Sequence, residues 1–113
     1  MALIKRGEIF LINFDPTVNH EAKKSGPGVV LSNEINNTHS PIISISPIAS
    51  NVMHVYSFEV EFLSGTADSR TRSKIMINQT RAVDKTRLIR KLGQLPDEIM
   101  DKVNQALKLH FEV

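Results

Sequence analysis

The sequence predicts a mainly β fold closed by a C-terminal helix, and three patterns carry that prediction. Residues Ser57–Phe62 alternate apolar with polar side chains, so that phenylalanine and valine share one face of a strand and glutamate the other. Two further runs, Glu8–Phe14 and Pro41–Ile48, are rich in isoleucine, a β-branched residue that favours strands. The last segment repeats its apolar residues at helical spacing instead. Together these patterns predict a series of strands followed by one helix.

The first two strands flank a polar loop. The run Glu8–Phe14 ends at Asp15-Pro16, which is a turn signal, and Val29–Leu31 is a short apolar run bounded by Gly28 and Asn33. We therefore predict a strand on each side. The loop between them holds a histidine, a glutamate and two lysines outside the core, where side chains are free to carry function.

The middle of the chain predicts further strands separated by polar segments. Glu34–Ser40 is polar and predicts a loop or a single helical turn, and the serines interleaved along Pro41–Ile48 indicate a half-buried strand. Ser64–Ser73 contains glycine, serine, threonine and arginine without an apolar run, which predicts a flexible loop. Two late strand segments are predicted over Lys74–Ile77 and Thr80–Val83.

Two helices are predicted at the C-terminal end. A short helix is expected over Lys85–Lys91, ended by Gly93. The longer helix begins within Leu95–Glu98, where a proline and two acidic residues suit a helix N-terminus. Its apolar stripe, which we expect to dock on the sheet or on a partner, comprises Ile99, Met100, Val103, Ala106, Leu107 and His110. Because His110 lies on this stripe, we interpret it, like His39, as structural.

The composition is that of an ordinary globular protein. The 113 residues suit a single domain over 1–113, with a hydrophobic fraction of 41% and a charged fraction of 23%. No apolar run of about 18 residues and no secretory signal pattern is present, so we expect a cytoplasmic protein without membrane contact. Cysteine is absent, and the four histidines show no metal-binding spacing. We therefore expect no disulfide, metal centre or cofactor.

Positive charge is concentrated in the second half of the chain. The formal net charge is only +2, but residues 70–91 contain eight arginines and lysines against the single acidic residue Asp84. Such a local excess could bind phosphate groups. The alternative interpretation is that these charged residues form a solvent-exposed face that binds no phosphate.

Short motifs follow one another in a fixed order along the chain. They are Arg6-Gly7-Glu8-Ile9, Phe14-Asp15-Pro16-Thr17, His20-Glu21, Pro27 with Val29-Val30-Leu31-Ser32, Pro47-Ile48, Ser57-Phe58-Glu59-Val60 and Gln79-Thr80-Arg81. In order and spacing this series resembles the MazF/PemK family of toxins, small endoribonucleases that cut single-stranded RNA. The resemblance covers nearly the whole chain, including the closing helix.

The resemblance implies a fold, an activity and partners. The fold would be a small SH3-like barrel of the MazF/PemK (CcdB-like) type that forms a homodimer. The activity would be that of the toxin of a type II toxin–antitoxin system, a metal-independent, sequence-selective endoribonuclease. A cognate antitoxin would inhibit it by filling the dimer groove, and the toxin–antitoxin complex would bind operator DNA.

Four positions depart from the family's usual pattern. Gly26 stands where the family usually has an arginine, Ala49 where it has a threonine, and Asn78 where it often has an aspartate. Met76 replaces an arginine that some members carry. None of these four side chains can take over the proton transfer or charge stabilisation that the usual residues supply. The second interpretation is therefore a catalytically degenerate toxin-fold protein that binds nucleic acid or an antitoxin without cleavage.

Metal-free RNA cleavage needs a base, a cation and an acid, and the loop before Gly26 offers candidates for all three. Histidine can serve as a base or an acid near neutral pH, so His20 is the leading candidate, with Glu21 beside it and Lys24 as a replacement for the missing positive charge. The alternative for His20 is a surface histidine in a flexible loop. Ser50 follows the strand at which the family's hydroxyl residue lies, although it could equally serve to turn the chain.

A second group of residues could hold RNA. Amides can read bases, Arg81 can bind a phosphate bidentately, and Tyr56 can stack on an unpaired base. Gln79 and Arg81 could equally be structural, and Tyr56 could cap the core. The candidate RNA-binding residues are Lys23, Asn51, His54, Tyr56, Arg70, Arg72, Asn78, Gln79 and Arg81.

Overall fold

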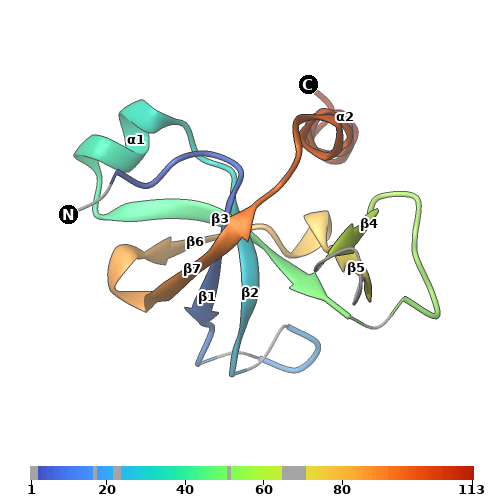
Figure 1. The fold of residues 1–113 in the computed structure, drawn as a ribbon, viewed down its shortest axis with the longest axis horizontal. Coiled ribbons are helices and arrows are strands. Elements are labelled where there is room, and N and C mark those ends of the chain that lie inside the picture. The colour runs from blue at the N-terminus through green and yellow to red at the C-terminus, as the bar shows by residue number, and fades with distance from the viewer. Residues whose placement is uncertain (1–2, 17, 22–23, 51, 65–70) are drawn as a thin grey trace.

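The computed structural model of the protein describes residues 3–16, 18–21, 24–50, 52–64 and 71–113. Within them the chain forms a curved antiparallel sheet, two α-helices and two 3-10 turns (Figure 1). The elements are β1 Glu8–Asn13, β2 Ser25–Val30, α1 Glu34–His39, β3 Ile42–Ala49, β4 Val60–Ser64, β5 Thr71–Ile75, η1 Ile77–Gln79, β6 Arg81–Asp84, η2 Lys85–Arg87, β7 Leu88–Gln94 and α2 Asp97–Phe111. The predicted fold class, a mainly β fold with a C-terminal helix, is confirmed.

Strand β3 holds the two parts of the sheet together. The strand order is β4-β5-β3-β2-β1-β7, and β6 also pairs with β3. The first half of β3 pairs with β6 from Ile42 to Ile45, whereas its last two residues, Ile48 and Ala49, pair with β5. Because its neighbour changes along its length, β3 turns the sheet into an open half-barrel.

The core consists of two clusters on opposite faces of the sheet. Val29 and Val30 are neighbours in β2, and because side chains alternate along a strand, each belongs to a different cluster. One cluster lies under α2 and comprises Val29, Leu31, Ile48, Val60, Phe62, Ile75, Ile77, Leu95, Val103 and Ala106. The other fills the barrel and comprises Ile12, Phe14, Val30, Ile43, Ile45 and Val83.

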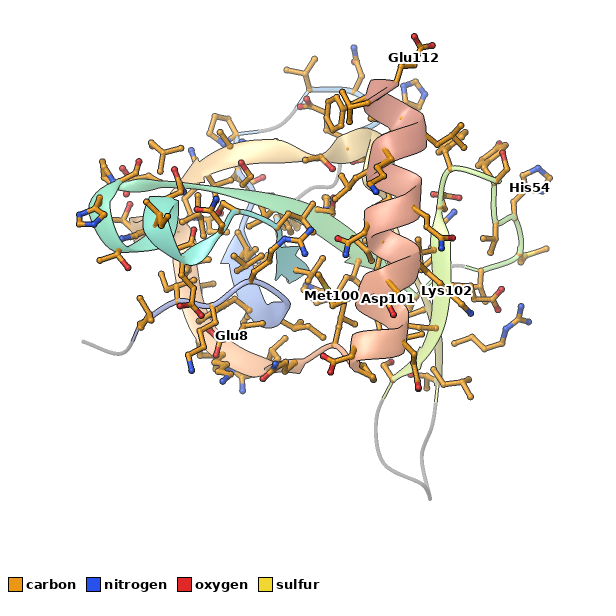
Figure 2. All side chains as sticks on the ribbon, turned by 90° about the horizontal axis from the view of Figure 1, so that it is seen from above. Glu8, His54, Met100, Asp101, Lys102 and Glu112 are labelled. Atoms are coloured by element: carbon orange, nitrogen blue, oxygen red, sulfur yellow. The ribbon has the colours of Figure 1, made fainter. Side chains whose placement is uncertain are left out.

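Helix α2 is fixed to the sheet by packing and by one arginine. Asp97 and Glu98 occupy its first turn, as the sequence predicts, and its inward face buries Val103 and Ala106. The Arg6 guanidinium donates from Nε to the Leu31 carbonyl and from Nη2 to Asn104 Oδ1 of the helix, both at 2.7 Å. Figure 2 shows α2 packed across the sheet, with Met100 and Lys102 labelled on the helix.

The prediction of a helix over Lys85–Lys91 is wrong. Only Lys85–Arg87 forms a 3-10 turn, and the chain then continues as β7. The reason is tertiary, because β7 pairs with β1, from Glu8 opposite Gln94 to Ile12 opposite Leu88. A long-range ladder of this kind overrides the helix propensity of lysine, arginine and leucine.

Two strands begin at residues other than those predicted. The alternating segment Ser57–Phe62 becomes strand only at Val60 (β4), because its first half forms a turn in which the Glu59 N–H donates to the Tyr56 carbonyl at 2.9 Å. The strand predicted at Val29–Leu31 begins earlier, at Ser25, where Gly26 pairs with Ile12 of β1.

Both ends of the predicted loop Ser64–Ser73 belong to strands. Residues 65–70 lie outside the described residues, and the final part, from Thr71, belongs to β5, where Ser73 pairs with Phe62. The strand predicted at Lys74–Ile77 accordingly starts earlier and ends at Ile75. The segment Glu34–Ser40 forms the short helix α1, capped by the Asn33 side chain. His110 is exposed and edge-on to Phe111, so it does not pack on the sheet with the buried residues of the predicted stripe.

Candidate functional site

A cavity of about 320 Å³ opens where β1, β3 and β6 approach one another. Its apolar part comes from Phe14 and Pro47, both buried in the core. The remaining lining residues supply one carboxylate, one guanidinium, two amides and one hydroxyl: Glu21, Arg81, Asn78, Gln79 and Thr80. A carboxylate and a cation facing a partly apolar cavity could move a proton and stabilise a developing negative charge.

The polar wall of the cavity is built on η1 and the start of β6. The Thr80 hydroxyl donates to the Ile77 carbonyl at 2.6 Å and lies 2.5 Å from the hydroxyl of Ser46, which is fully buried. Arg81 follows directly and donates from Nη1 to the Phe14 carbonyl at 3.3 Å. Because a guanidinium carries five N–H donors, this bond orients Arg81 and uses only one of them.

Glu21 comes to the cavity from the loop between β1 and β2. Its Oε1 accepts from the Val18 N–H at 2.6 Å, and its own N–H donates to the Val18 carbonyl at 3.2 Å, which makes a tight turn. The base of the loop is closed by two bonds: the Phe14 N–H donates to the Lys24 carbonyl at 2.7 Å, and the Lys24 N–H donates to Asp15 Oδ1 at 3.0 Å. The loop therefore returns on itself and carries Glu21 to the cavity.

The structure brings together four of the residues that the sequence proposes, namely Glu21, Asn78, Gln79 and Arg81. His20 is exposed on the same loop but is not among the described residues that line the cavity. Ser50 is exposed just beyond the end of β3, and Lys24 is exposed with its backbone at the base of the loop. Lys23, Asn51 and Arg70 lie outside the described residues.

His54 lies in a different place, on the segment that precedes β4 and beside Lys74 of β5 (Figure 2), and Tyr56 contacts its ring. The Tyr56 ring stacks on Phe58 at 5.2 Å between centroids, and the His54 ring meets it edge-on at 4.8 Å. Lys74 holds this segment by donating to the His54 carbonyl at 2.8 Å and to Glu59 Oε1 at 3.0 Å. Tyr56 is half exposed, so it does not cap the core.

Arg72 is ion-paired with Glu61 on the neighbouring strand. Both belong to the β4–β5 pair, where Arg72 lies opposite Leu63, and Arg72 does not line the cavity among its described residues. An exposed pair of this kind contributes little to stability. Arg72 is thus part of the same edge as Tyr56.

Three of the four positions that depart from the family pattern, Gly26, Met76 and Asn78, differ in their surroundings. A Cβ on Gly26 would lie 3.6 Å from Cε2 of Phe14, in ordinary van der Waals contact with a ring that lines the cavity. Asn78 lines the cavity itself, and Met76 accepts a bond from Gln79 Nε2 at its sulfur, 3.5 Å away. A side chain at position 26 would therefore enter or border the cavity.

Sequence reasoning missed three lining residues, Phe14, Pro47 and Thr80. Thr80 stands between two residues that were proposed, so its place in the Gln79-Thr80-Arg81 motif is the signal that could have found it. Phe14 and Pro47 read as core residues, and a sequence gives no sign of which end of a core side chain borders a cavity.

Comparison with known proteins points in one direction. A family model described as PemK-like, MazF-like toxin of type II toxin–antitoxin system matches residues 5–111. The chain is 30% identical over 116 residues to endoribonuclease MazF9 of Mycobacterium tuberculosis, covering 98% of each chain. It is 32% identical over 108 residues to endoribonuclease EndoA of Bacillus subtilis, covering 95% of this chain and 93% of that one.

Solved structures share the fold. MazF of Deinococcus radiodurans superposes with a TM-score of 0.84 at 22% identity, with 100% of both chains covered. A mycobacterial endoribonuclease in complex with its cognate antitoxin superposes with a TM-score of 0.74 at 18% identity, covering 100% of this chain and 97% of that one. At sequence identities of 22% and 18%, these superpositions show that the fold is shared.

Proposed function

Because this chain belongs to the PemK-like, MazF-like toxins of type II toxin–antitoxin systems, we propose that it is an endoribonuclease that cuts single-stranded RNA at the cavity lined by Glu21 and Arg81. The observation that carries the proposal is that a carboxylate from the β1–β2 loop and a guanidinium from β6 line one cavity together with two amides. Two endoribonucleases among the relatives match nearly the full length of the chain, which supports the activity.

The proposed reaction is an attack of the ribose 2′-hydroxyl on the adjacent phosphorus. The Glu21 carboxylate takes the proton from the 2′-oxygen, the bond from that oxygen to phosphorus forms, and the bond to the 5′-oxygen breaks. Arg81 stabilises the negative charge that gathers on the non-bridging phosphate oxygens. The 5′-oxygen leaves with a proton, so that the products are a 2′,3′-cyclic phosphate and a 5′-hydroxyl end. The reaction needs no metal ion.

Among the sequence candidates, the cavity favours Glu21 as the base, because it is Glu21 that lines the cavity together with Arg81. His20 neighbours Glu21 on the same loop, and we retain it as the candidate donor of the proton to the leaving oxygen. The RNA cleavage assay described at the end of this subsection, carried out on His20→Ala, tests that role. Lys24 and Ser50 remain candidates for phosphate contacts at the rim.

Asn78 and Gln79 are proposed to select the RNA sequence. Their amides lie on the cavity wall and offer both donors and acceptors, as the edges of an unpaired base require. Tyr56, half exposed at the β4–β5 edge, is proposed to stack on a further base of the strand. Lys23, Asn51, His54, Arg70 and Arg72 complete the proposed RNA-binding set.

We also propose the partners that the family implies. A homodimer would cover part of the apolar surface that α2 exposes. A cognate antitoxin would fill the groove of that dimer. One structural relative is an endoribonuclease in complex with its cognate antitoxin, which supports this proposal. Operator DNA would be bound through the toxin–antitoxin complex, and the site of action would be the cytoplasm. No helix in the described part of the chain is long and apolar enough to cross a membrane.

The test is incubation of the purified protein with a long single-stranded RNA in EDTA, followed by mapping of new 5′ ends. Discrete cuts with 5′-hydroxyl ends are the expected result. RNA that is bound at low salt but stays intact would contradict the proposal and identify the protein as a degenerate toxin fold that binds without cutting.

A further inference from the structure

Three consecutive backbone carbonyls at the end of β1 each accept a hydrogen bond from an arginine. Arg87 donates from Nη1 to the Asn13 carbonyl at 3.2 Å and also to the Asp15 carbonyl. Arg81 donates from Nη1 to the Phe14 carbonyl between them at 3.3 Å. The two arginines come from β6 and η2, and they meet β1 where it leaves the sheet for the loop that carries Glu21.

Arg87 is itself presented by a well-defined turn. Asp84 caps η2, because its Oδ1 accepts from the Thr86 N–H and from the Thr86 hydroxyl, both at 2.9 Å. The turn closes with the Leu88 N–H donating to the Lys85 carbonyl. Because both ends of the turn are hydrogen-bonded, the backbone from which Arg87 projects is held relative to β6.

The residues that Arg87 holds also hold the other end of the loop. Asp15 accepts from the Lys24 N–H at its side chain, and Phe14 donates from its N–H to the Lys24 carbonyl. The two chain segments that flank the loop are therefore joined at the Arg87 contact. A displacement of Asn13–Asp15 would move the base of the loop and with it Glu21.

We propose that Arg87 is a positioning residue for RNA cleavage, which fixes the base of the β1–β2 loop and so sets Glu21 against Arg81. This inference rests on the proposed function of the cavity. Arg87 is not among the described residues that line the cavity, so it acts through the loop and not on the substrate. A small misplacement of a catalytic group can cost about 100-fold in rate, which gives such a contact its importance.

The experiment compares Arg87→Met, Arg87→Lys and the matched control Arg90→Met. Arg90 is an exposed arginine three positions further along, in β7, so its substitution removes the same charge from the same part of the chain. We measure the cleavage rate at saturating RNA, the affinity for an RNA with a 2′-deoxy sugar at the cut site, the melting temperature, and the exchange rates of the Phe14 and Lys24 amides by NMR.

The expected result is a loss of about 10-fold or more in the rate at saturating RNA for Arg87→Met, with Arg90→Met within about 2-fold of the wild type. Affinity should fall equally in both methionine variants, because both lose one positive charge. Arg87→Lys, which keeps a charge and can still donate, should recover part of the rate. The Phe14 and Lys24 amides should exchange faster in Arg87→Met only.

The inference is overturned if Arg87→Met cleaves at the wild-type rate, or if Arg90→Met loses as much activity, since the effect would then be one of charge. A large drop in melting temperature for Arg87→Met together with full activity in Arg87→Lys would still support positioning, because the donor is restored. If the wild type does not cut RNA, the proposed function fails by itself, and the amide exchange of Phe14 and Lys24 separately decides whether Arg87 holds the loop.

Discussion

Two glycines of β2 differ in how much room their surroundings leave for a side chain. A Cβ on Gly28 would lie 2.7 Å from Cδ1 of Ile12 and 3.3 Å from the carbonyl oxygen of Ser46, and both of those residues are fully buried. A Cβ on Gly26 would meet only the edge of Phe14, at 3.6 Å. A side chain at Gly28 would therefore crowd its buried neighbours, whereas Gly26 leaves space beside the cavity.

Gly28→Ala is expected to lower the free energy of unfolding by about 1–3 kcal/mol, because the added methyl group overpacks the barrel. Denaturant unfolding monitored by circular dichroism measures the change. The matched control is Gly26→Ala on the same strand, for which a change of about 1 kcal/mol or less is expected. Equal losses in the two variants would show that the close approach at Gly28 has no energetic consequence.

Gly26→Arg should be accepted by the fold and should raise the cleavage rate. The new guanidinium would border the cavity next to Phe14 and add a second cation near the proposed phosphate position. The increase, about 10-fold, is measured as the single-turnover rate at saturating RNA. If the variant folds and cuts no faster than the wild type, the space beside Gly26 does not belong to the reaction site.

At the scale of elements, the edge strand β7 is tied to β1 by a buried carboxylate. Glu8 is only 5% exposed, and it accepts from the Lys5 N–H at 2.7 Å and from Lys91 Nζ at 2.5 Å. Burial raises the pKa of Glu8, but the bonds from Lys91 and Lys5 outweigh it and hold the pKa below its ordinary value of 4.5. The ionised form of Glu8 therefore stabilises the junction of the two strands.

This pKa sets the sign of a pH dependence. Because the folded pKa is lowered, the contribution of Glu8 is fully present above the unfolded value near 4.5 and is lost as the pH falls through the lower, folded value. Lys91→Met should therefore destabilise the protein at about pH 7 and less at about pH 3, because the stabilisation from ionised Glu8 diminishes as the pH falls below 4.5 towards the lowered folded pKa. Urea unfolding at the two pH values measures this, and an equal loss at both would contradict the assignment.

The same junction shows what the sequence could not reveal. The residues of Lys85–Lys91 have good helix propensity, and only the pairing of β7 with β1 makes them a strand. By contrast, the N-terminal turn of α2 and the core strands followed from local patterns, because proline, acidic residues and isoleucine runs act within a few residues. Long-range pairing is absent from any local window.

In the candidate site, too, some features could be predicted from the sequence and others depend on long-range contacts. The sequence proposed Glu21, Asn78, Gln79 and Arg81, and the structure places all four on one cavity. The sequence ranked His20 above Glu21, whereas the cavity is lined by Glu21, because which of two loop neighbours lines a cavity depends on how the loop folds back. That path is set by the bond from the Lys24 N–H to Asp15 and by the bond from Arg87 to the Asp15 carbonyl, and Arg87 lies 72 positions further along the chain.

At the scale of the whole molecule, the β1–β2 loop and α2 lie at opposite ends of the sheet (Figure 1). The end with α2 exposes large apolar side chains of the helix and the residues after it, namely Leu109, Phe111 and Val113. Leu109 also lines a cleft between α2 and the segment that precedes β4. An apolar surface of this kind is typical of a contact between protein chains, which agrees with the proposed homodimer.

Leu109→Lys should convert the proposed dimer to a monomer, because it places a charge within this apolar surface. Sedimentation velocity measures the oligomeric state. The control is Leu92→Lys in β7, also an exposed leucine, which should leave the dimer intact. A monomeric wild type, or a Leu109→Lys dimer of unchanged stability, would show that this surface is not the dimer contact.

Single-turnover cleavage of single-stranded RNA in EDTA by Glu21→Gln tests most directly whether the cavity lined by Glu21 and Arg81 cuts RNA. The control is Glu34→Gln, an exposed glutamate of α1 that does not line the cavity. We expect Glu21→Gln to lower the cleavage rate at saturating RNA about 100-fold or more while RNA binding is retained. Glu34→Gln should cleave at the wild-type rate. A Glu21→Gln protein that cuts RNA at the wild-type rate would contradict the proposed role of the cavity.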